Sequence, residues 1–325
     1  MSACERTINL QFTNSVQAGF LDINQAISRL NRKLFRQGTE VMIESIAIQS
    51  YSGTADEVQI GRLPSSYTTS NAWVKALAEW NEQQIEAAKE AGTESNKAKW
   101  RDFKVYMNSD HVEAGGIANL LPQGYELADE SADAESEWIY SQFVVPNTDV
   151  AGTPTPGDTQ EYVMHMTGGN KNSLSGDGQS KGCIFAYAES RSRPMSPDPN
   201  IVTGTQVGGL YADMEDVGET QEDIQYNWAN HGNVPPYPLA TDINQENYPG
   251  GSTIGESNNN KGHSEAVLSI GTNFRSTYGS FVAPLGLLYI GVAGGIAAEE
   301  VVNVQIKIAP GPMQGILARS MKEAN

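Results

Sequence analysis

The residues most able to perform chemistry in this chain are four histidines and two cysteines, and their spacing forms no known motif. The histidines are His111, His165, His231 and His263. None belongs to a His-x-x-x-His or His-Glu-x-x-His pattern, which would place two imidazoles on one metal ion. Cys4 and Cys183 form no Cys-x-x-Cys pair, so structural zinc is excluded and a disulfide between them has no support. We predict no metal and no cofactor, and we expect His165 to be a packed or rim residue of a strand.

The glycine-rich stretch TGGNKNSLSGDGQSKG, residues 167–182, resembles a phosphate-binding loop in composition only. A Walker loop requires Gly-x-x-x-x-Gly-Lys-Ser/Thr, so that backbone amides surround the phosphates and the lysine reaches them. Here Lys171 is followed by Asn172, and Lys181 is followed by Gly182. We interpret the stretch as a loop between two strands.

No catalytic pair can be chosen among the acidic residues, because they are too abundant. The chain has no Gly-x-Ser-x-Gly nucleophile elbow. The segment DMEDVGE, residues 213–219, offers four carboxylates without the EF-hand pattern, so we interpret it as a solvated loop, with a calcium site as the alternative. We predict that the protein is not an enzyme, and a carboxylate hydrolase on a β-sandwich remains an alternative.

Four basic side chains without an acid occupy eleven residues, SRLNRKLFRQG, from Ser28 to Gly38. They are Arg29, Arg32, Lys33 and Arg36, and they are the candidate nucleic-acid-binding residues. The whole chain carries 21 Lys and Arg against 39 Asp and Glu, a formal net charge of −18. Residues 110–260 contain only four basic residues among 23 acids. In a shell or a two-faced domain, this polarity, with a basic beginning and an acidic middle, would separate an inner surface from an outer one.

The local pattern around these cations predicts a helix over residues 22–37. Asp22 and Gln25 are suited to cap its start, and Gly38 is suited to end it. At 100° per residue, an apolar stripe from Ile23 to Leu34 is separated from the stripe of the four cations. The basic face has three interpretations: a solvated surface, contact with nucleic-acid phosphates, or contact with a membrane surface, for which the apolar stripe is short.

Short β-type runs separated by turn residues make up most of the remaining chain. They lie at residues 7–12, 40–51, 57–63, 137–146, 161–168, 182–190, 265–272, 280–292 and 300–311. Such a series is typical of an antiparallel sandwich or jelly roll. A second helix is predicted at residues 70–92, with Ser70 as its cap and Trp73, Leu77 and Trp80 on its buried side.

The fold class that we predict is therefore mostly β: a single jelly-roll antiparallel β-sandwich with two inserted helices. The domain is expected to span residues 1–325, with long acidic surface loops at about 108–135 and 190–262. No stretch approaches the roughly 18–20 apolar residues that span a bilayer, and no signal peptide is recognised at the start, so we expect no membrane partner and synthesis inside a cell without export.

Seven ordered segments spread over nearly the whole chain together resemble capsid proteins of small circular single-stranded DNA viruses, a group known mainly from environmental and marine sequences. They are RTINLQFTNSV (6–16), LNRKLFRQG (30–38), LPSSYTTSNAWVKALAEW (63–80), GCIFAYAESRSRP (182–194), NHGNVPPYP (230–238), SFVAPLGLLYI (280–290) and IKIAPGPMQGILA (306–318). The resemblance implies a jelly-roll coat protein that assembles into an icosahedral shell, without catalysis. One departure is that the chain begins MSACERTINLQF, with Arg6 alone, where many such proteins have a long basic arm.

From this resemblance we expect a structural protein of the virion, synthesised and assembled inside the host cell. Its partners would be many symmetric copies of itself and the packaged single-stranded DNA, held weakly and without sequence specificity. A host receptor is not identified by the sequence. The alternative from a different class is a β-sandwich glycan-binding module of a phage fibre or similar structure.

Overall fold

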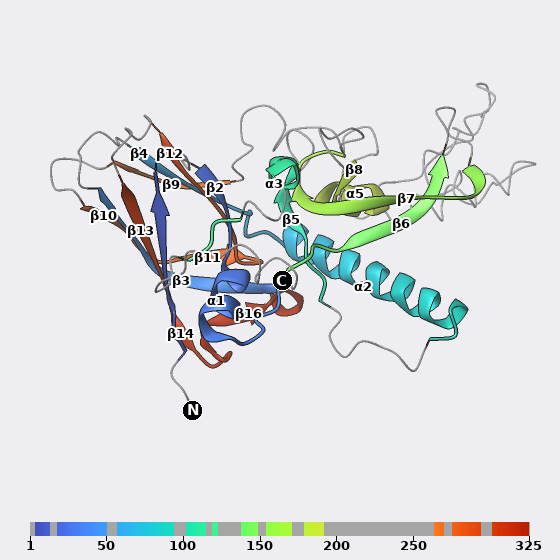
Figure 1. The fold of residues 1–325 in the computed structure, drawn as a ribbon, viewed down its shortest axis with the longest axis horizontal. Coiled ribbons are helices and arrows are strands. Elements are labelled where there is room, and N and C mark those ends of the chain that lie inside the picture. The colour runs from blue at the N-terminus through green and yellow to red at the C-terminus, as the bar shows by residue number, and fades with distance from the viewer. Residues whose placement is uncertain are drawn as a thin grey trace, which may run out of the picture.

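The computed structural model describes residues 4–13, 18–50, 57–93, 102–114, 119–122, 138–148, 154–170, 179–191, 263–269, 275–293 and 301–324. These residues form two antiparallel sheets that face each other as a sandwich, and a third sheet with helices beside it (Figure 1). The predicted mostly-β class is confirmed. Most of the segments 108–135 and 190–262, predicted as long acidic loops, lie outside the described residues.

The first sheet contains six strands arranged around the long central strand β3. They are β1 (Thr7–Phe12), β13 (Val302–Ile308), β3 (Thr39–Ser50), β10 (Arg275–Tyr278), β11 (Phe281–Pro284) and β16 (Ala318–Ser320). Their order is β1-β13-β3-β10, and β11 and β16 also pair with β3. In β1, Ile8, Leu10 and Phe12 are buried while Asn9 and Gln11 are exposed. This confirms the predicted alternation, which places one face on the core and the other in solvent.

The second sheet has the order β2-β12-β4-β9 and closes the other side of the sandwich. Its strands are β2 (Ala18–Asp22), β12 (Leu287–Ala293), β4 (Glu57–Arg62) and β9 (His263–Ser269). Leu288 and Ile290 of β12 are fully buried in the same core as Ile46 and Ile48 of β3. The two sheets therefore share one continuous apolar core, as expected of a sandwich.

The run 280–292, predicted as one strand, is two strands in different sheets joined by a sharp turn. Leu285 and Gly286 both have positive φ, 57° and 69°, and the turn carries the chain from β11 to β12. A side chain at Gly286 would begin 2.7 Å from the Asn24 amide nitrogen. That nitrogen donates a hydrogen bond to the Leu285 carbonyl at 2.8 Å, so the glycine lets α1 pack tightly against the turn.

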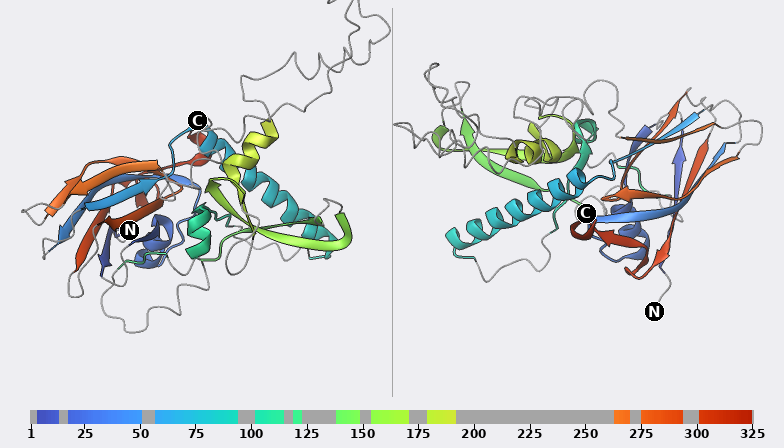
Figure 2. Two further views of the ribbon diagram at one scale, coloured as in Figure 1. Left: turned by 90° about the horizontal axis from the view of Figure 1, so that it is seen from above. Right: turned by 180° about the vertical axis from the view of Figure 1, so that it is seen from behind.

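Between β4 and β9 the described chain forms an additional unit, which we call the inserted lobe (described residues 63–191). It contains α2 (Tyr67–Glu90), α3 (Ser109–Ala114), α5 (Cys183–Arg191) and a third sheet of order β5-β7-β6, with β8 beside β7. The strands are β5 (Tyr106–Asn108), β6 (Gln142–Thr148), β7 (Pro154–Thr167) and β8 (Gln179–Gly182). All views place this unit to one side of the sandwich (Figure 2).

The inserted lobe packs on the outer face of the second sheet. Phe20 of β2 and Leu287 of β12 point away from the sandwich core and join a second apolar cluster with Val105, Met107 and Met166. Strands β2 and β12 are therefore buried on both faces. The chain ends near this junction, where the short helix η5 (Met321–Glu323) contributes Met321 to the same cluster.

The run 182–190, predicted as a strand, is helix α5. Cys183, Ile184 and Tyr187 are buried at helical spacing in the second cluster, where α5 packs against α2. A short continuous apolar run fits either a strand or a helix by its letters. Packing against α2 decides the outcome in favour of the helix.

The second predicted helix is confirmed with a shifted start. Helix α2 begins at Tyr67 and is capped by Ser66, whose hydroxyl accepts from the Thr69 amide. Ser70, the predicted cap, lies inside the helix and donates to the Tyr67 carbonyl. Trp73, Leu77 and Trp80 lie in the second cluster as predicted.

The remaining described pair is a small hairpin near the C-terminus, formed by β14 (Pro310–Gly311) and β15 (Gly315–Ile316). It lies between β13 and β16 in the chain. Gly315 approaches Cys4, since a side chain there would begin 2.6 Å from the Cys4 Cβ. The start of the described chain therefore contacts this hairpin.

Candidate nucleic-acid interface

The four predicted nucleic-acid-binding residues lie at and beyond the end of a helix that is shorter than predicted. Helix α1 runs from Ile23 to Asn31, and Arg32 follows in a left-handed conformation with φ 50°. Only Arg29 is in the helix; Arg32, Lys33 and Arg36 belong to the connection to β3. The prediction that all four share one stripe of a helix over residues 22–37 is therefore wrong.

The buried ring of Phe35 explains why the helix ends early. Phe35 is 4% exposed and belongs to the sandwich core, whereas Leu34, predicted to be buried, is 42% exposed. The Phe35 amide donates to the Ser28 hydroxyl at 2.8 Å, and this hydroxyl donates to the Asn24 carbonyl at 2.6 Å. A serine inside the last turn thus holds the reversed chain, and tertiary packing overrides the helical pattern.

The predicted cap of α1 is confirmed at Asp22 but not at Gln25. One Asp22 carboxylate oxygen accepts from the amides of Asn24 and Gln25. The Gln25 side chain, expected to complete a capping box, instead accepts from the Asn119 amide nitrogen at 2.8 Å. It is used to join the sandwich to the inserted lobe.

Two of the four cations project into solvent and two have contacts within the fold. Arg32 and Lys33 are exposed. The Arg36 Nε lies 2.7 Å from the Asp102 carboxylate, which also receives Lys104 at 3.7 Å, and Arg29 is half-buried. Within the described chain, Arg32 and Lys33 are therefore the members of the set available to a polyanion without breaking an ion pair.

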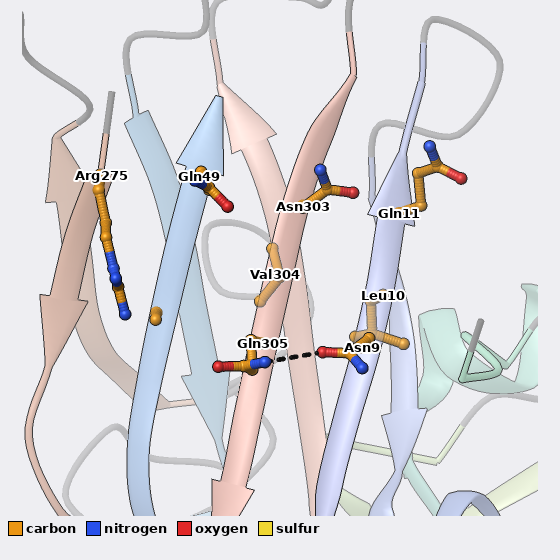
Figure 3. Close-up of a pocket in the computed structure, with 9 residues that line it drawn as sticks. Asn9, Leu10, Gln11, Gln49, Arg275, Asn303, Val304 and Gln305 are labelled. Atoms are coloured by element: carbon orange, nitrogen blue, oxygen red, sulfur yellow. Dashed lines mark hydrogen bonds between the residues drawn. The ribbon is translucent and has the colours of Figure 1, made fainter. Parts of the chain in front are cut away.

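A hollow of about 370 Å³ lies on the outer face of the first sheet, and five of its nine lining residues are Asn or Gln (Figure 3). Its lining residues are Asn9, Leu10, Gln11, Ala47, Gln49, Arg275, Asn303, Val304 and Gln305. The Gln305 side-chain nitrogen donates to the side-chain oxygen of Asn9 at 3.1 Å, which joins β13 to β1 (Figure 3). No carboxylate lines the hollow, although the chain has 39 acids.

Sequence reasoning missed the hollow, yet a signal was present. Strands β1 and β13 read INLQF and VNVQI, with an amide at each outward position of both segments. The register places Asn9 opposite Gln305 and Gln11 opposite Asn303. Residues almost 300 positions apart are brought together only by that pairing, which the alternation alone does not specify.

A buried polar network joins the sandwich to the inserted lobe, and Asp22 is its sandwich end. The second Asp22 oxygen accepts from Gln37 at 3.2 Å and from the Trp138 indole at 3.1 Å. Burial raises the pKa of Asp22 to about 6, although these hydrogen bonds and those of the helix cap act to lower it. The Gln37 amide also pairs with the backbone of Val105, through bonds of 2.7 and 3.1 Å.

On the lobe side, the central ionisable residue of the same network is His111. Its Nδ1 accepts from the Met107 amide at 3.0 Å, so its Nε2 carries the proton toward the Asn119 oxygen at 2.6 Å. Burial lowers the pKa of His111 to about 4, against the Asn119 hydrogen bond that raises it. The ring stacks on Phe20 at 4.5 Å, and Asn119 also donates to the Tyr140 hydroxyl.

The other potential nucleophiles and ligands are placed as structural residues. Burial raises the pKa of the Cys183 thiol to about 12, and Cys4 is half-buried with a raised pKa from the same cause. His165 is buried in β7, as predicted, and its Nε2 lies 3.2 Å from the Gly169 carbonyl. His231 and the acidic segment 213–219 lie outside the described residues, and the strand residue His263 is described in its backbone only.

Neither a metal cluster nor a membrane span is found in the part of the chain that the structure describes. No group of three or more His, Cys, Asp or Glu side chains there converges on one point. None of the helices in that part combines the length and apolar character needed to cross a bilayer.

Comparison with known proteins gives no assignment. The chain matches no protein family, no curated protein and no solved structure. Any functional conclusion must therefore come from the fold and from the residues themselves.

Proposed function

We propose that the sandwich is a jelly roll and that the protein is the structural capsid protein of a small single-stranded DNA virus. In this proposal many copies assemble into an icosahedral shell around the genome. The observation that carries the proposal is the way in which eight strands pair between the two halves of the chain.

The pairing is nested. Taken in chain order as β1, β2, β3, β4, β9, β10, β12 and β13, the first strand pairs with the last, the second with the seventh, the third with the sixth and the fourth with the fifth. Every one of these pairs is antiparallel. Such nesting is what results when a long hairpin of four outgoing and four returning strands is rolled into two facing sheets, and it supports the jelly roll that viral capsid, lectin and cupin domains use.

The position of the inserted lobe supports a role in assembly. It enters at the middle of the nested series, between the fourth and fifth strands, and it covers part of one sheet. The first sheet keeps an exposed outer face, including Asn9, Gln49 and Arg275. A subunit with one covered and one open face presents different surfaces to its symmetry mates and to the interior of a closed shell.

The charge distribution supports an assembly that responds to salt. At a formal charge of −18 per chain, copies repel one another at low ionic strength, and screening shortens that repulsion to about 10 Å at 0.1 M salt. Arg32 and Lys33 are exposed and give each copy a small positive surface. Repeated over many copies, weak phosphate contacts of this kind retain DNA without sequence specificity.

Light scattering on the purified protein across a salt and pH series, followed by nuclease digestion, tests the proposal. We expect a discrete species of many copies that forms more readily as salt rises and that protects DNA from nuclease. A protein that remains a clean monomer under every condition contradicts it.

The alternative, a glycan-binding module, draws on the same fold, because lectin domains also use jelly rolls. The hollow on the first sheet carries five amide side chains and is of a size that takes a small ligand. Its nine lining residues include no aromatic ring, however, and small-molecule sites usually have aromatic walls. A glycan array with specific binding, lost in a Gln49→Ala variant, would favour this alternative over the capsid.

A further inference from the structure

We infer that the amide-lined hollow on the first sheet binds nucleotides of single-stranded DNA. This inference rests on the proposed function. The hollow lies over β1, β13, β3 and β10, and outward side chains of these strands make up most of its lining (Figure 3). Five of its nine lining residues are Asn or Gln, and its one charged member is Arg275. Its volume of about 370 Å³ lies at the lower end of the range of ligand sites in proteins.

The side-chain chemistry of the hollow suits bases and phosphates. Each Asn or Gln presents a donor and an acceptor on one planar group, which matches the edges of bases, and an arginine matches a phosphate or a guanine. Gln305 and Asn9 are held by their mutual hydrogen bond at 3.1 Å, so part of this surface is preorganised. Gln11, Gln49 and Arg275 are exposed and remain accessible around that pair.

The exclusion of acids favours a polyanion as the occupant. A chain with 39 Asp and Glu places none of them among the nine lining residues. Glu44 is the exposed acid of β3. It lies outside the lining, at the irregularity where β3 pairs with β13 beside Lys307. The hollow is therefore neutral to positive, and phosphates approach it without meeting a carboxylate of its lining.

A linear path connects the hollow to the basic segment, which fits an extended polymer better than a compact ligand. Asn31, the last residue of α1, exchanges two hydrogen bonds with the backbone of Glu5 at 2.7 and 2.9 Å. Strand β1 starts two residues later, and Asn9 lies only four residues from Glu5. At about 3.3 Å per strand residue, the contact at Asn31 and the edge of the hollow are about 13 Å apart.

Two further cations lie along that path. Lys307 is exposed and stands opposite Thr7 in the register of β1 and β13, and Arg6 directly precedes β1. The path from Lys33 through Arg6 and Lys307 to the hollow thus carries cations at its start and amides at its end. The path passes two exposed acids, Glu5 before β1 and Glu44 beside Lys307. The hollow offers no aromatic ring for stacking, so each copy binds weakly and many copies bind together.

A charge-changing pair of variants with a matched control tests the inference. In Gln11→Glu/Gln49→Glu, two exposed amides of the hollow become nearly isosteric carboxylates. In Gln84→Glu/Gln142→Glu, the same chemical change is made in the inserted lobe, at half-buried Gln84 on α2 and at exposed Gln142 on β6. Both double variants add the same charge, so a general effect of net charge cancels between them.

Fluorescence anisotropy of a labelled single-stranded oligonucleotide of about 20 nucleotides, longer than the 4–16 that one module usually covers, gives the affinity. Because two unit charges are placed beside phosphates, the hollow variant is expected to bind about tenfold or more weakly than wild type. The control variant is expected to stay within about twofold. Electron microscopy of the same preparations shows whether shells form.

The outcomes distinguish failure of the DNA-binding hollow from failure of the proposed capsid function. Equal loss in both variants, or no loss in either, overturns the inference. So does a hollow variant that binds DNA normally but no longer forms shells, because the face is then a subunit contact. Absence of shells in wild type contradicts the proposed function, whereas a selective loss of DNA binding in the hollow variant still supports the hollow.

Discussion

Asp22 and His111 should make opposite contributions to the pH dependence of stability, and these offset each other in the wild-type protein. Replacing either residue alone should reveal the contribution of the other. Both are buried in the polar network between the sandwich and the inserted lobe. Burial raises the pKa of Asp22 from 3.8 to about 6 and lowers the pKa of His111 from 6.5 to about 4. Tyr140, which faces both, has a pKa raised well above 10 and stays neutral throughout this range.

The signs of the two contributions are opposite. The folded state holds a proton on Asp22 more tightly than the unfolded state, so the Asp22 contribution to the unfolding free energy is lost as pH rises from about 4 to 6. The folded state resists protonating His111, so its contribution is lost as pH falls from about 6.5 to 4. One pKa unit corresponds to about 1.4 kcal/mol, and each contribution therefore amounts to about 3 kcal/mol. The two nearly cancel between pH 4 and 6.5.

Urea denaturation followed by tryptophan fluorescence at several pH values measures the effect. Relative to wild type, Asp22→Asn is expected to gain about 3 kcal/mol of unfolding free energy as pH rises from 4 to 6.5, since only His111 then titrates. His111→Gln, whose amide can still donate to Asn119, is expected to lose about 3 kcal/mol from pH 4 to 6. The absolute stability of each variant also changes through lost hydrogen bonds, which is why the slope against pH is compared.

The double variant Asp22→Asn/His111→Gln is the internal control, because it removes both titrations and should again parallel wild type. Other carboxylates contribute equally to all four proteins and disappear from the differences. Single-variant curves that run parallel to wild type from pH 4 to 6.5 would refute the reasoning.

Three further predictions follow from the basic segment and the core. Arg32→Gln/Lys33→Gln should leave the urea midpoint nearly unchanged, because both side chains are exposed. The same variant should lower the amount of DNA recovered from nuclease-treated particles. A DNA content equal to that of wild type would contradict a contact between this segment and the genome. Phe35→Ala should lower the free energy of unfolding by about 3–5 kcal/mol, because the ring is buried. Leu34→Ala should lower it by less than about 1 kcal/mol, because this side chain is 42% exposed. Similar losses in the two variants would contradict the early end of α1. A thiol reagent at pH 8 should label Cys4 well before Cys183 in the folded protein, and equal rates would show that the inserted lobe does not bury Cys183.

The sequence predicts those parts of the fold that depend on local alternation. In β1, the buried Ile8, Leu10 and Phe12 follow directly from a period of two, and the stop of α2 follows from Gly92, which has φ 64°. The fold class follows from the number of such runs. These features need no partner that is distant in the chain.

Features set by distant contacts could not be predicted in the same way. The end of α1 depends on Phe35 entering the core and on Ser28 holding its amide, and neither is visible in the helical pattern of residues 22–37. Helix α5 depends on α2, because its letters fit a strand equally well. The hollow depends on the register between Asn9 and Gln305, and the buried network depends on Asp22 meeting Trp138 across 116 positions.

The candidate interface was predicted in part. The segment with Arg29, Arg32, Lys33 and Arg36 was found from composition, because four cations in eleven residues are conspicuous in an acidic chain. That Arg36 pairs with Asp102 and that Arg29 is half-buried depends on how the lobe and sandwich meet. The genome-facing role of the segment stays a prediction.

Electron microscopy of the purified protein at moderate salt tests the central proposal most directly. We predict closed, uniform particles whose subunits contain a nested eight-stranded sandwich, with the first-sheet hollow facing the enclosed DNA. Isolated monomers in every field, at all salt concentrations and pH values examined, would contradict the proposal that this chain is a capsid protein.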